Sequence, residues 1–380
     1  MEPKPHIVLV TSRWFKNQNL YFTALKLVQI LKPLSREITW IITEQEDKNY
    51  PAGEFTLLKI PDRTVEKPLA ARLWYLVLHQ MRVVHQVLRL GKDQGVVIFA
   101  FGADYFVLPM LAAKLKGKRV ALRTDGRTSR VIGKYWQRKN RPLQMLYQGV
   151  EAVTYGISDA IIPESENFVG LYDMGHYEKK TWAGSLYVDT ARFAVQKGIS
   201  ERKYDLGFVG RFSREKGIIE FVSALGTALD GEECRVALIG DGDLRSEVEA
   251  ILARDQLREF VDVIGWIDNT DLPRHLNTIK VLVVPSYREG LPNIVLEAMA
   301  CGCIVLATPV GGIPALVRDG VTGFITEDNS SGTLSQNIRR ALRHPDMKGI
   351  SETARELIER SYTYDAAVRQ YGQILAHISS

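Results

Sequence analysis

The chain has 380 residues, of which 46% are hydrophobic, enough for two globular domains of ordinary size. Its formal net charge of +5 is too weak a bias to indicate a nucleic-acid-binding protein, but it is compatible with anionic substrates or an anionic membrane surface. Three cysteines are an odd and sparse count, which argues against a disulfide framework and for a reducing, cytoplasmic location.

The N-terminal sequence does not resemble a signal peptide, because its first apolar run covers only residues 7–10. No uncharged apolar stretch reaches the ~18 residues of a membrane-spanning helix. We therefore expect a protein without a transmembrane segment, with peripheral contact at the inner face of a membrane as a further option.

The first half alternates short apolar runs with longer helical patterns. Strands are predicted at 7–11, 38–43, 56–60, 96–101, 119–123 and 159–163. Helices are predicted at 20–31, 69–90, 105–115 and 143–155. This alternation is typical of an α/β domain with a parallel sheet.

The second half repeats the alternation. Strands are predicted at 206–209, 235–239, 260–264, 281–284, 304–307 and 323–326. Helices are predicted at 215–229, 243–253, 272–278, 292–300 and 331–343, followed by a last helix at 364–378. The regular pattern fades around 189–203. We therefore predict two doubly wound, Rossmann-like domains, 1–195 and 196–362, facing a central cleft, and a separate C-terminal helix at 363–380.

The most informative stretch is 280–303, which predicts a strand, a polar loop and a helix. Pro292 suits the first helical position, and Gly302 suits the end of the helix. Glu289 lies in the loop and Glu297 in the second helical turn. A helix N-terminus attracts anions, so this unit offers donors for a phosphate and two acceptors for hydroxyl groups. The alternative is that both carboxylates are simply solvated.

The same stretch resembles the E-x7-E signature of retaining glycosyltransferases of family 4, which have the GT-B fold. The positions that carry the resemblance are Pro285, Ser286, Glu289, Gly290, Pro292, Asn293, Glu297, Ala298, Gly302, Gly311, Gly312 and Gly323. The resemblance implies transfer of a sugar from a nucleotide-diphosphate sugar to a hydroxyl acceptor, which could be a glycan, a lipid-linked molecule or a small molecule. It also implies that the last helix crosses back to the first domain.

Three further segments in the second half fit this interpretation. Gly210 to Gly217 follows a strand, and its Arg211 and Lys216 could reach one anion or could be solvated loop charges. The resemblance assigns these two cations to the donor diphosphate, without a metal or another cofactor. It also places the Gly240–Gly242 turn and the backbone beside Trp266 at the donor, although a tight turn and a core or rim aromatic are equally simple explanations.

The resemblance implies separate roles for the two glutamates. Glu297 would hold the ribose, and Glu289 would hold the transferred sugar and stabilise positive charge on its ring. The backbone at Gly290, Leu291 and Asn293 would contact the donor. The alternatives are a nucleotide-sugar epimerase, a phosphorylase, for which no pyridoxal-lysine signal is visible, or a non-catalytic nucleotide-sugar-binding protein.

The first half matches the family less well. Its first loop lacks glycine, so Arg13 or Lys16 would have to replace the usual phosphate contact, and Asp125 stands where relatives often carry histidine. Residues 127–141 are basic with two aromatics, and 69–90 is a long apolar pattern. Together they suit contact with an anionic membrane, or else a solvated loop beside a buried helix.

Overall fold

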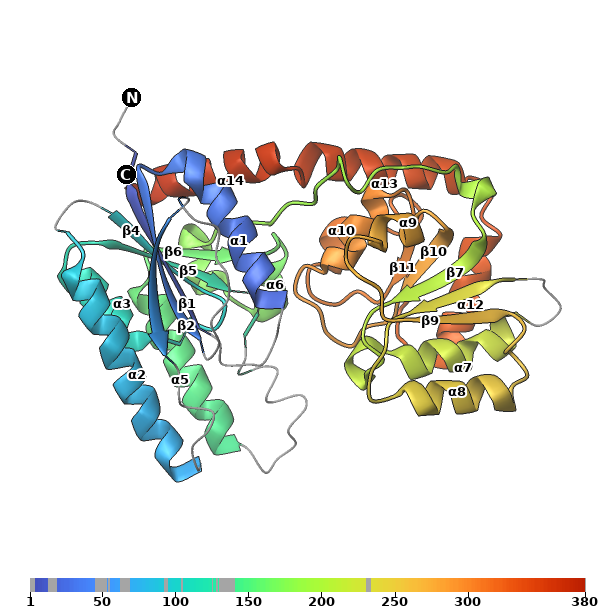
Figure 1. Cartoon of the computed structure of the whole chain (residues 1–380), viewed down its shortest axis with the longest axis horizontal. Helices are drawn as coiled ribbons and strands as arrows, with labels where there is room; N and C mark the ends of the chain where they lie inside the picture. The colour runs from blue at the N-terminus through green and yellow to red at the C-terminus, as the bar shows by residue number, and fades with distance from the viewer. Residues whose placement is uncertain are drawn as a thin grey trace. The chain divides into compact units, whose positions relative to one another are not determined.

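A computed structural model describes residues 4–12, 19–44, 53, 55–61, 69–91, 95–103, 105–124, 126–127, 129, 141–229 and 234–379. The chain divides into two compact units, Met1–Leu186 with Ala367–Ser380, and Tyr187–Ala366 (Figure 1). The predicted boundary lies a short way further along the chain, between residues 195 and 196.

The first unit contains a parallel sheet of six strands in the order β3-β2-β1-β4-β5-β6. The strands are β1 (His6–Ser12), β2 (Glu37–Glu44), β3 (Thr56–Pro61), β4 (Gly95–Ala100), β5 (Arg119–Thr124) and β6 (Ala160–Pro163). The α-helices are α1 (Asn19–Leu31), α2 (Leu69–Arg89), α3 (Val107–Leu115), α5 (Arg141–Ile157) and α6 (Phe168–Tyr172). Buried side chains of β1, β4 and β5 pack against α2, α3 and α5, which cover one face of the sheet.

The second unit contains another six-stranded parallel sheet, in the order β12-β11-β10-β7-β8-β9. The strands are β7 (Tyr204–Val209), β8 (Val236–Ile239), β9 (Val261–Gly265), β10 (Ile279–Val284), β11 (Ile304–Ala307) and β12 (Phe324–Ile325). The α-helices are α7 (Ile218–Ala228), α8 (Arg245–Arg254), α9 (Leu272–Leu276), α10 (Asn293–Ala300), α11 (Ile313–Leu316), α12 (Ser331–Leu342), α13 (Met347–Ser361) and α14 (Tyr364–Ser379), the last of which continues into the first unit.

The second sheet is covered on both faces, as its continuous apolar strands require. One hydrophobic core joins the sheet to α7, α8 and α12, and a second joins it to α9, α10 and α13. Figure 1 shows α7 and α8 side by side below this sheet. The predicted strand and helix alternation is confirmed in both halves, and no helix in the described part of the chain is long and apolar enough to span a bilayer.

The structure corrects two predicted helix starts, and it contains helices that were not predicted, among them the short α6 and α11. Helix α7 begins at Ile218, because Gly217 has a left-handed φ of 68° and separates a short 3-10 turn, Arg214–Lys216, from the helix. Pro292 is the N-cap of α10 and not its first residue, because its ψ of 117° is extended. Helix α13 was not predicted.

Candidate functional site

The order of strands in the second sheet reverses between β7 and β10, which pair in parallel. Open α/β sheets bind ligands beyond the carboxyl ends of the strands at such a point, because the two following loops diverge there. The loops at this point are residues 210–217 after β7 and 285–292 after β10. They carry Arg211, Lys216 and Glu289, three of the residues that the sequence analysis selected.

The loop residues meet in an ion pair. Lys216 Nζ lies 2.7 Å from Glu289 Oε1, and the Ser286 hydroxyl donates to the same oxygen at 2.6 Å. The Glu289 side chain is only 8% exposed, whereas that of Lys216 is 32% exposed. Within the described residues, no hydrogen-bond donor reaches Glu289 Oε2. This carboxylate is therefore fixed through one oxygen, and its other oxygen can accept from a ligand hydroxyl.

The loop that carries Glu289 passes between two glycines. Gly217 and Gly311 have left-handed φ angles of 68° and 58°. A Cβ atom on Gly217 would lie 2.0 Å from the Pro285 carbonyl oxygen, and one on Gly311 would lie 2.0 Å from the Glu289 carbonyl oxygen. Only glycine permits both the conformation and the close approach. At these two points the backbone of the Glu289 loop therefore packs directly against a glycine, and any larger residue there would push the loop away.

Further hydrogen bonds hold the same loop. Tyr287 N donates to the Glu215 carbonyl oxygen at 2.9 Å, and the Tyr287 hydroxyl donates to Glu220 Oε1 at 2.7 Å. Thr308 Oγ1 donates to the Ser286 carbonyl oxygen at 2.5 Å. The sequence analysis quoted Ser286 only as part of a pattern and missed the other supporting residues. Ser286, three residues before Glu289, could be recognised from the sequence as a partner of this carboxylate. The residues that support the loop from far along the chain, such as Glu220 and Thr308, give no such local signal.

Arg211 differs from Lys216 in its surroundings. It is exposed, and its guanidinium makes no polar contact with any described residue. Lys216 is half-buried and already paired with a carboxylate. Of these two predicted cations, Arg211 is therefore the one whose charge no described carboxylate balances.

The second glutamate lies on α10. Glu297 is 8% exposed and occupies the second turn of the helix, as predicted. Asn293, the first residue of α10, is exposed, and Leu291 is half-buried in the loop before it. The Pro292 carbonyl oxygen accepts the first helical hydrogen bond, from Val295 N at 3.0 Å. Both glutamates thus belong to the segment that leads from β10 into α10.

The turns after β7, β8 and β9 are joined edge to edge. Gly210 N donates to the Ile239 carbonyl oxygen at 2.9 Å, and Gly240 N donates to the Gly265 carbonyl oxygen at 2.8 Å. Gly242 N is bound by Asp241 Oδ1 at 2.8 Å. The predicted donor-pocket glycines therefore line one edge of the second sheet.

Trp266, which follows β9, is 73% exposed. The sequence left open that Trp266 is simply a core aromatic or a rim aromatic. Its exposure rules out a core position and fits a position at the rim. A large exposed indole beside the turns at Gly240 and Gly265 is available to cover the flat face of a ligand.

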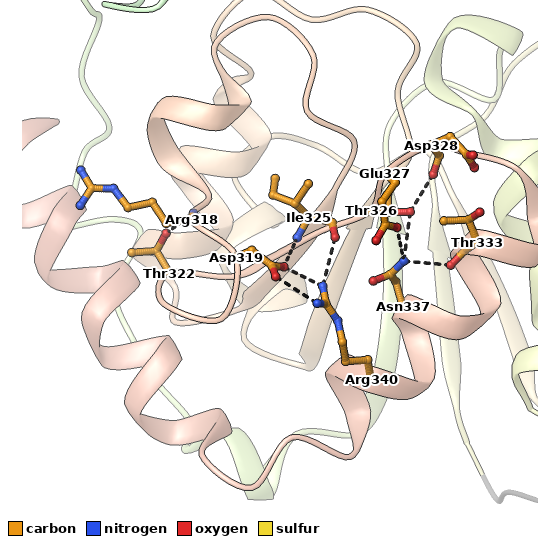
Figure 2. A network of polar contacts seen from close by, with 10 residues as sticks. All are labelled: Arg318, Asp319, Thr322, Ile325, Thr326, Glu327, Asp328, Thr333, Asn337 and Arg340. Atoms are coloured by element: carbon orange, nitrogen blue, oxygen red, sulfur yellow. Dashed lines mark hydrogen bonds and ion pairs between the residues drawn. The ribbon is translucent and has the colours of Figure 1, made fainter.

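A polar network lies at the end of β12 (Figure 2). Arg340 contacts both oxygens of Asp319, at 3.0 and 2.6 Å, and Asn337 donates to Glu327 Oε2 at 3.0 Å. Just after this network, Asn329 Nδ2 donates to the Pro285 carbonyl oxygen at 3.3 Å. The network therefore fixes a segment that contacts the start of the Glu289 loop.

Several predicted residues lie elsewhere or outside the described residues. Arg13, Lys16 and Asp125 fall outside them, as do residues 130–140 of the basic segment. Arg127, at the start of that segment, is bound to Glu151 Oε2 at 3.2 Å. No cluster of metal-ligating side chains occurs in the described part of the chain.

The three cysteines all lie in the second unit, where they are buried, reduced thiols. Burial raises the pKa of the Cys301 thiol to about 12 and that of the Cys303 thiol to about 11. Arg202 donates to Cys303 Sγ at 3.4 Å and to the Cys301 carbonyl oxygen at 2.7 Å. Both thiols therefore stay protonated and unreactive at neutral pH.

Within the second unit, most of the sequence matches a known protein family. Residues 189–364 match the family described as glycosyl transferases group 1. An alpha-D-kanosaminyltransferase of Streptomyces kanamyceticus is 27% identical over 190 residues, 50% of this chain and 49% of the relative. An N-acetyl-alpha-D-glucosaminyl L-malate synthase of Bacillus anthracis is 26% identical over 187 residues, 49% of each chain. The chain thus matches about half the length of these curated relatives.

Solved structures are similar over nearly the whole chain. HepE of Anabaena, crystallised in complex with UDP, superposes with a TM-score of 0.74 at 16% identity and covers 98% of this chain and 99% of its own. Sucrose-phosphate synthase of Thermosynechococcus elongatus gives a TM-score of 0.72 at 17% identity, with 99% of both chains covered. The chain has the GT-B fold, as the resemblance implied.

Proposed function

We propose that the chain is a glycosyltransferase that moves a sugar from a nucleotide-diphosphate sugar to a hydroxyl acceptor, with retention at the anomeric carbon. The observation that carries the proposal is the Lys216–Glu289 ion pair at the switch point of the second sheet. This sheet lies within residues 189–364, the segment that matches group 1 glycosyl transferases. Similar folds bind UDP and UDP-glucose, so UDP-glucose is the first donor to test.

The residues present fit the chemistry of this reaction. When the bond between the anomeric carbon and the phosphate oxygen breaks, negative charge develops on the diphosphate and positive charge on the sugar ring. Arg211 and Lys216 would stabilise the first charge and the Glu289 carboxylate the second, most strongly in the transition state. The acceptor oxygen bonds to the anomeric carbon on the face that the diphosphate leaves, and its proton passes to a phosphate oxygen. Glu297 would hold the ribose.

We further propose that the diphosphate is held by cationic side chains without a metal. Two cations on the loop after β7, Arg211 and Lys216, would supply the charge that a divalent ion would otherwise provide. Activity should survive chelator treatment nearly intact. Complete loss on chelation, with rescue by Mg²⁺ or Mn²⁺, would refute this part of the proposal while leaving transferase activity itself established.

The cytoplasmic location expected from the sequence also stays a prediction.

The test of the function has two steps. A thermal-shift screen across nucleotide sugars should identify the donor. A ligand at 100 times its dissociation constant adds about 2.7 kcal/mol to the free energy of unfolding, which raises the melting temperature. The donor is then incubated with and without candidate acceptors, and the anomeric configuration of the product is read by NMR. Nucleotide release that needs no acceptor would indicate an epimerase or hydrolase, and a thermal shift without turnover across acceptors would favour a non-catalytic binding protein.

A further inference from the structure

The helices on one face of the first sheet expose many large apolar side chains. We define the outer apolar surface as the exposed large hydrophobic residues of α2, α3 and α5. They are Trp74, Val77, Met81, Leu88, Leu111, Leu115, Met145, Leu146 and Val153. Trp74 is 64% exposed, Met145 68% and Leu115 87%. Large apolar patches exposed on a soluble protein mark interaction sites.

The pattern on α2 shows that this exposure is not incidental. Trp74, Val77 and Met81 are spaced by three and four residues, which places them on one face of the helix. Val83 and Val87 of the same helix are fully buried in the core of the first unit. Helix α2 is therefore apolar on its inner face and again on its outer face, whereas a helix that meets only water carries a polar outer face.

The three helices form one layer. Helix α2 packs against α3, and α3 packs against α5, so α3 lies between the other two (Figure 1). All three contribute buried residues to the same core beneath them. The exposed apolar side chains are consequently carried by the helices of a single layer.

The exposed charged side chains described on this layer are all basic. The sequences of α2, α3 and α5 contain a single carboxylate, Glu151, and it is buried and bound by Ser129 N at 2.9 Å and Ser129 Oγ at 2.6 Å. Arg82, Arg89 and Arg141 are exposed on the same helices, and no carboxylate pairs with any of them in the described part of the chain. The face therefore combines apolar side chains with uncompensated positive charge.

We propose that the outer apolar surface docks on an anionic lipid bilayer. Its apolar side chains would enter the boundary between headgroups and acyl chains, and the arginines would contact lipid phosphates, as in interfacial helices. Arg127, by contrast, is held by Glu151 within the protein, so the docking face lies on these helices and does not depend on that end of the basic segment. The proposal goes beyond the transferase reaction and would suit a lipid-linked acceptor.

A second copy of the chain is the less favourable occupant. In a two-fold symmetric dimer the same patch meets itself, so the arginines of α2 and α5 would face a second basic surface whose helices offer no exposed carboxylate. Like charges brought together in a desolvated interface destabilise it. An anionic bilayer instead supplies the opposite charge.

Flotation with lipid vesicles tests the proposal without any substrate. The full chain is mixed with vesicles of phosphatidylcholine alone or with added phosphatidylglycerol. We expect recovery with the acidic vesicles, and a fall of at least tenfold in vesicle partitioning for the variant Trp74→Gln/Met81→Gln/Leu115→Gln. Glutamine keeps helix propensity, and these side chains are exposed, so the variant should fold. A matched control, Val195→Gln/Val321→Gln, removes exposed apolar side chains of the second unit and should float like the wild type.

A charge variant tests the electrostatic part. Arg89→Gln/Arg141→Gln should bind acidic vesicles more weakly, and raised salt should weaken the wild type in the same way, because screening shortens the reach of surface charges. The proposal is overturned if the wild type floats equally with neutral vesicles, if it floats with neither, or if the triple variant floats normally. A wild-type dimer seen by light scattering that the triple variant abolishes would assign the surface to a second copy.

Discussion

At the residue scale, the two candidate diphosphate ligands are not equivalent. Lys216 is held by Glu289 at 2.7 Å, so part of its charge is balanced before any ligand arrives. Arg211 is exposed and has no polar side-chain partner among the described residues. Of the two, Arg211 would offer its full charge to a leaving diphosphate, whereas Lys216 also fixes the position of Glu289.

Replacing Arg211 should therefore cost transition-state stabilisation directly. Arg211→Ala should lower kcat/KM by a factor that corresponds to about 2–4 kcal/mol, the range for a lost preorganised charge contact. The measurement is steady-state transfer with the donor found in the thermal-shift screen. Arg214→Ala is the matched control, because Arg214 is another exposed arginine of the same loop. Equal rates for the two variants would show that Arg211 has no special role.

The two glutamates should separate in kinetics. Glu297 is expected to contact the ribose, which does not react, so Glu297→Ala should mainly weaken donor binding. Glu289→Gln keeps the size of the side chain but removes the negative charge that would stabilise the positive charge on the sugar ring. It should lower kcat far more than it raises the donor KM. Steady-state constants for each variant, together with nucleotide affinity by calorimetry, provide the comparison.

Two results would contradict these roles. If Glu289→Gln turns over normally while Glu297→Ala loses kcat at unchanged donor affinity, the roles are reversed. If both variants keep full activity, the glutamate pair is structural. Because Lys216 is bound to Glu289, the double variant Lys216→Ala/Glu289→Gln should lose less than the sum of the two single losses.

At the scale of elements, the loop between β10 and α10 depends on its neighbours for its shape. Gly311→Ala would place a methyl group 2.0 Å from the Glu289 carbonyl oxygen, so the loop must move. We expect a lower Tm and a large loss of kcat. Gly320→Ala is a matched control, because Gly320 has a similar φ of 69° with nothing within 4 Å of the added atom.

The control separates two costs of the same substitution. Gly320→Ala should lose only the strain of a left-handed alanine, about 1–2 kcal/mol, and keep its activity. Gly311→Ala should show the same strain and also the displacement of Glu289. Should both variants lose stability equally and retain activity, the contact at Gly311 would not be what positions the Glu289 loop.

Most elements could be predicted from local sequence, because buried parallel strands are continuous apolar runs between turn residues. The site was predicted less completely. Glu289 and Lys216 were selected separately, but their pairing joins residues 73 positions apart and needs the strand order of the sheet. Helix α13 was missed because its apolar positions, Ile350, Ala354, Leu357 and Ile358, lie on one narrow stripe of a mostly polar segment. Its start signal, the Asp346 N-cap, was visible in the sequence.

At the scale of the whole molecule, α14 belongs to both units, since the division falls between Ala366 and Ala367. In the first unit its Tyr371 is fully buried. The Tyr371 hydroxyl accepts from Arg123 Nε at 3.1 Å and donates to the Gly184 carbonyl oxygen at 3.0 Å. Arg123 is also buried, and its other polar contact is Glu164 at 2.8 Å. A buried guanidinium therefore depends on a hydroxyl supplied by the last helix.

Removing that hydroxyl should weaken the first unit while leaving the second intact. Burial raises the pKa of Tyr371, so its hydroxyl is neutral at pH 7 and serves Arg123 as a hydrogen-bond acceptor. Tyr371→Phe leaves Arg123 Nε buried without this acceptor, and we expect a loss of about 1–3 kcal/mol in the free energy of unfolding. Calorimetry should show the loss in the transition of the first unit, while nucleotide affinity, which we propose for the second unit, should stay unchanged. Gln373→Ala, at an exposed position of the same helix, is the control and should match the wild type. Equal stability of Tyr371→Phe and the control would mean that α14 is held in the first unit by apolar packing alone.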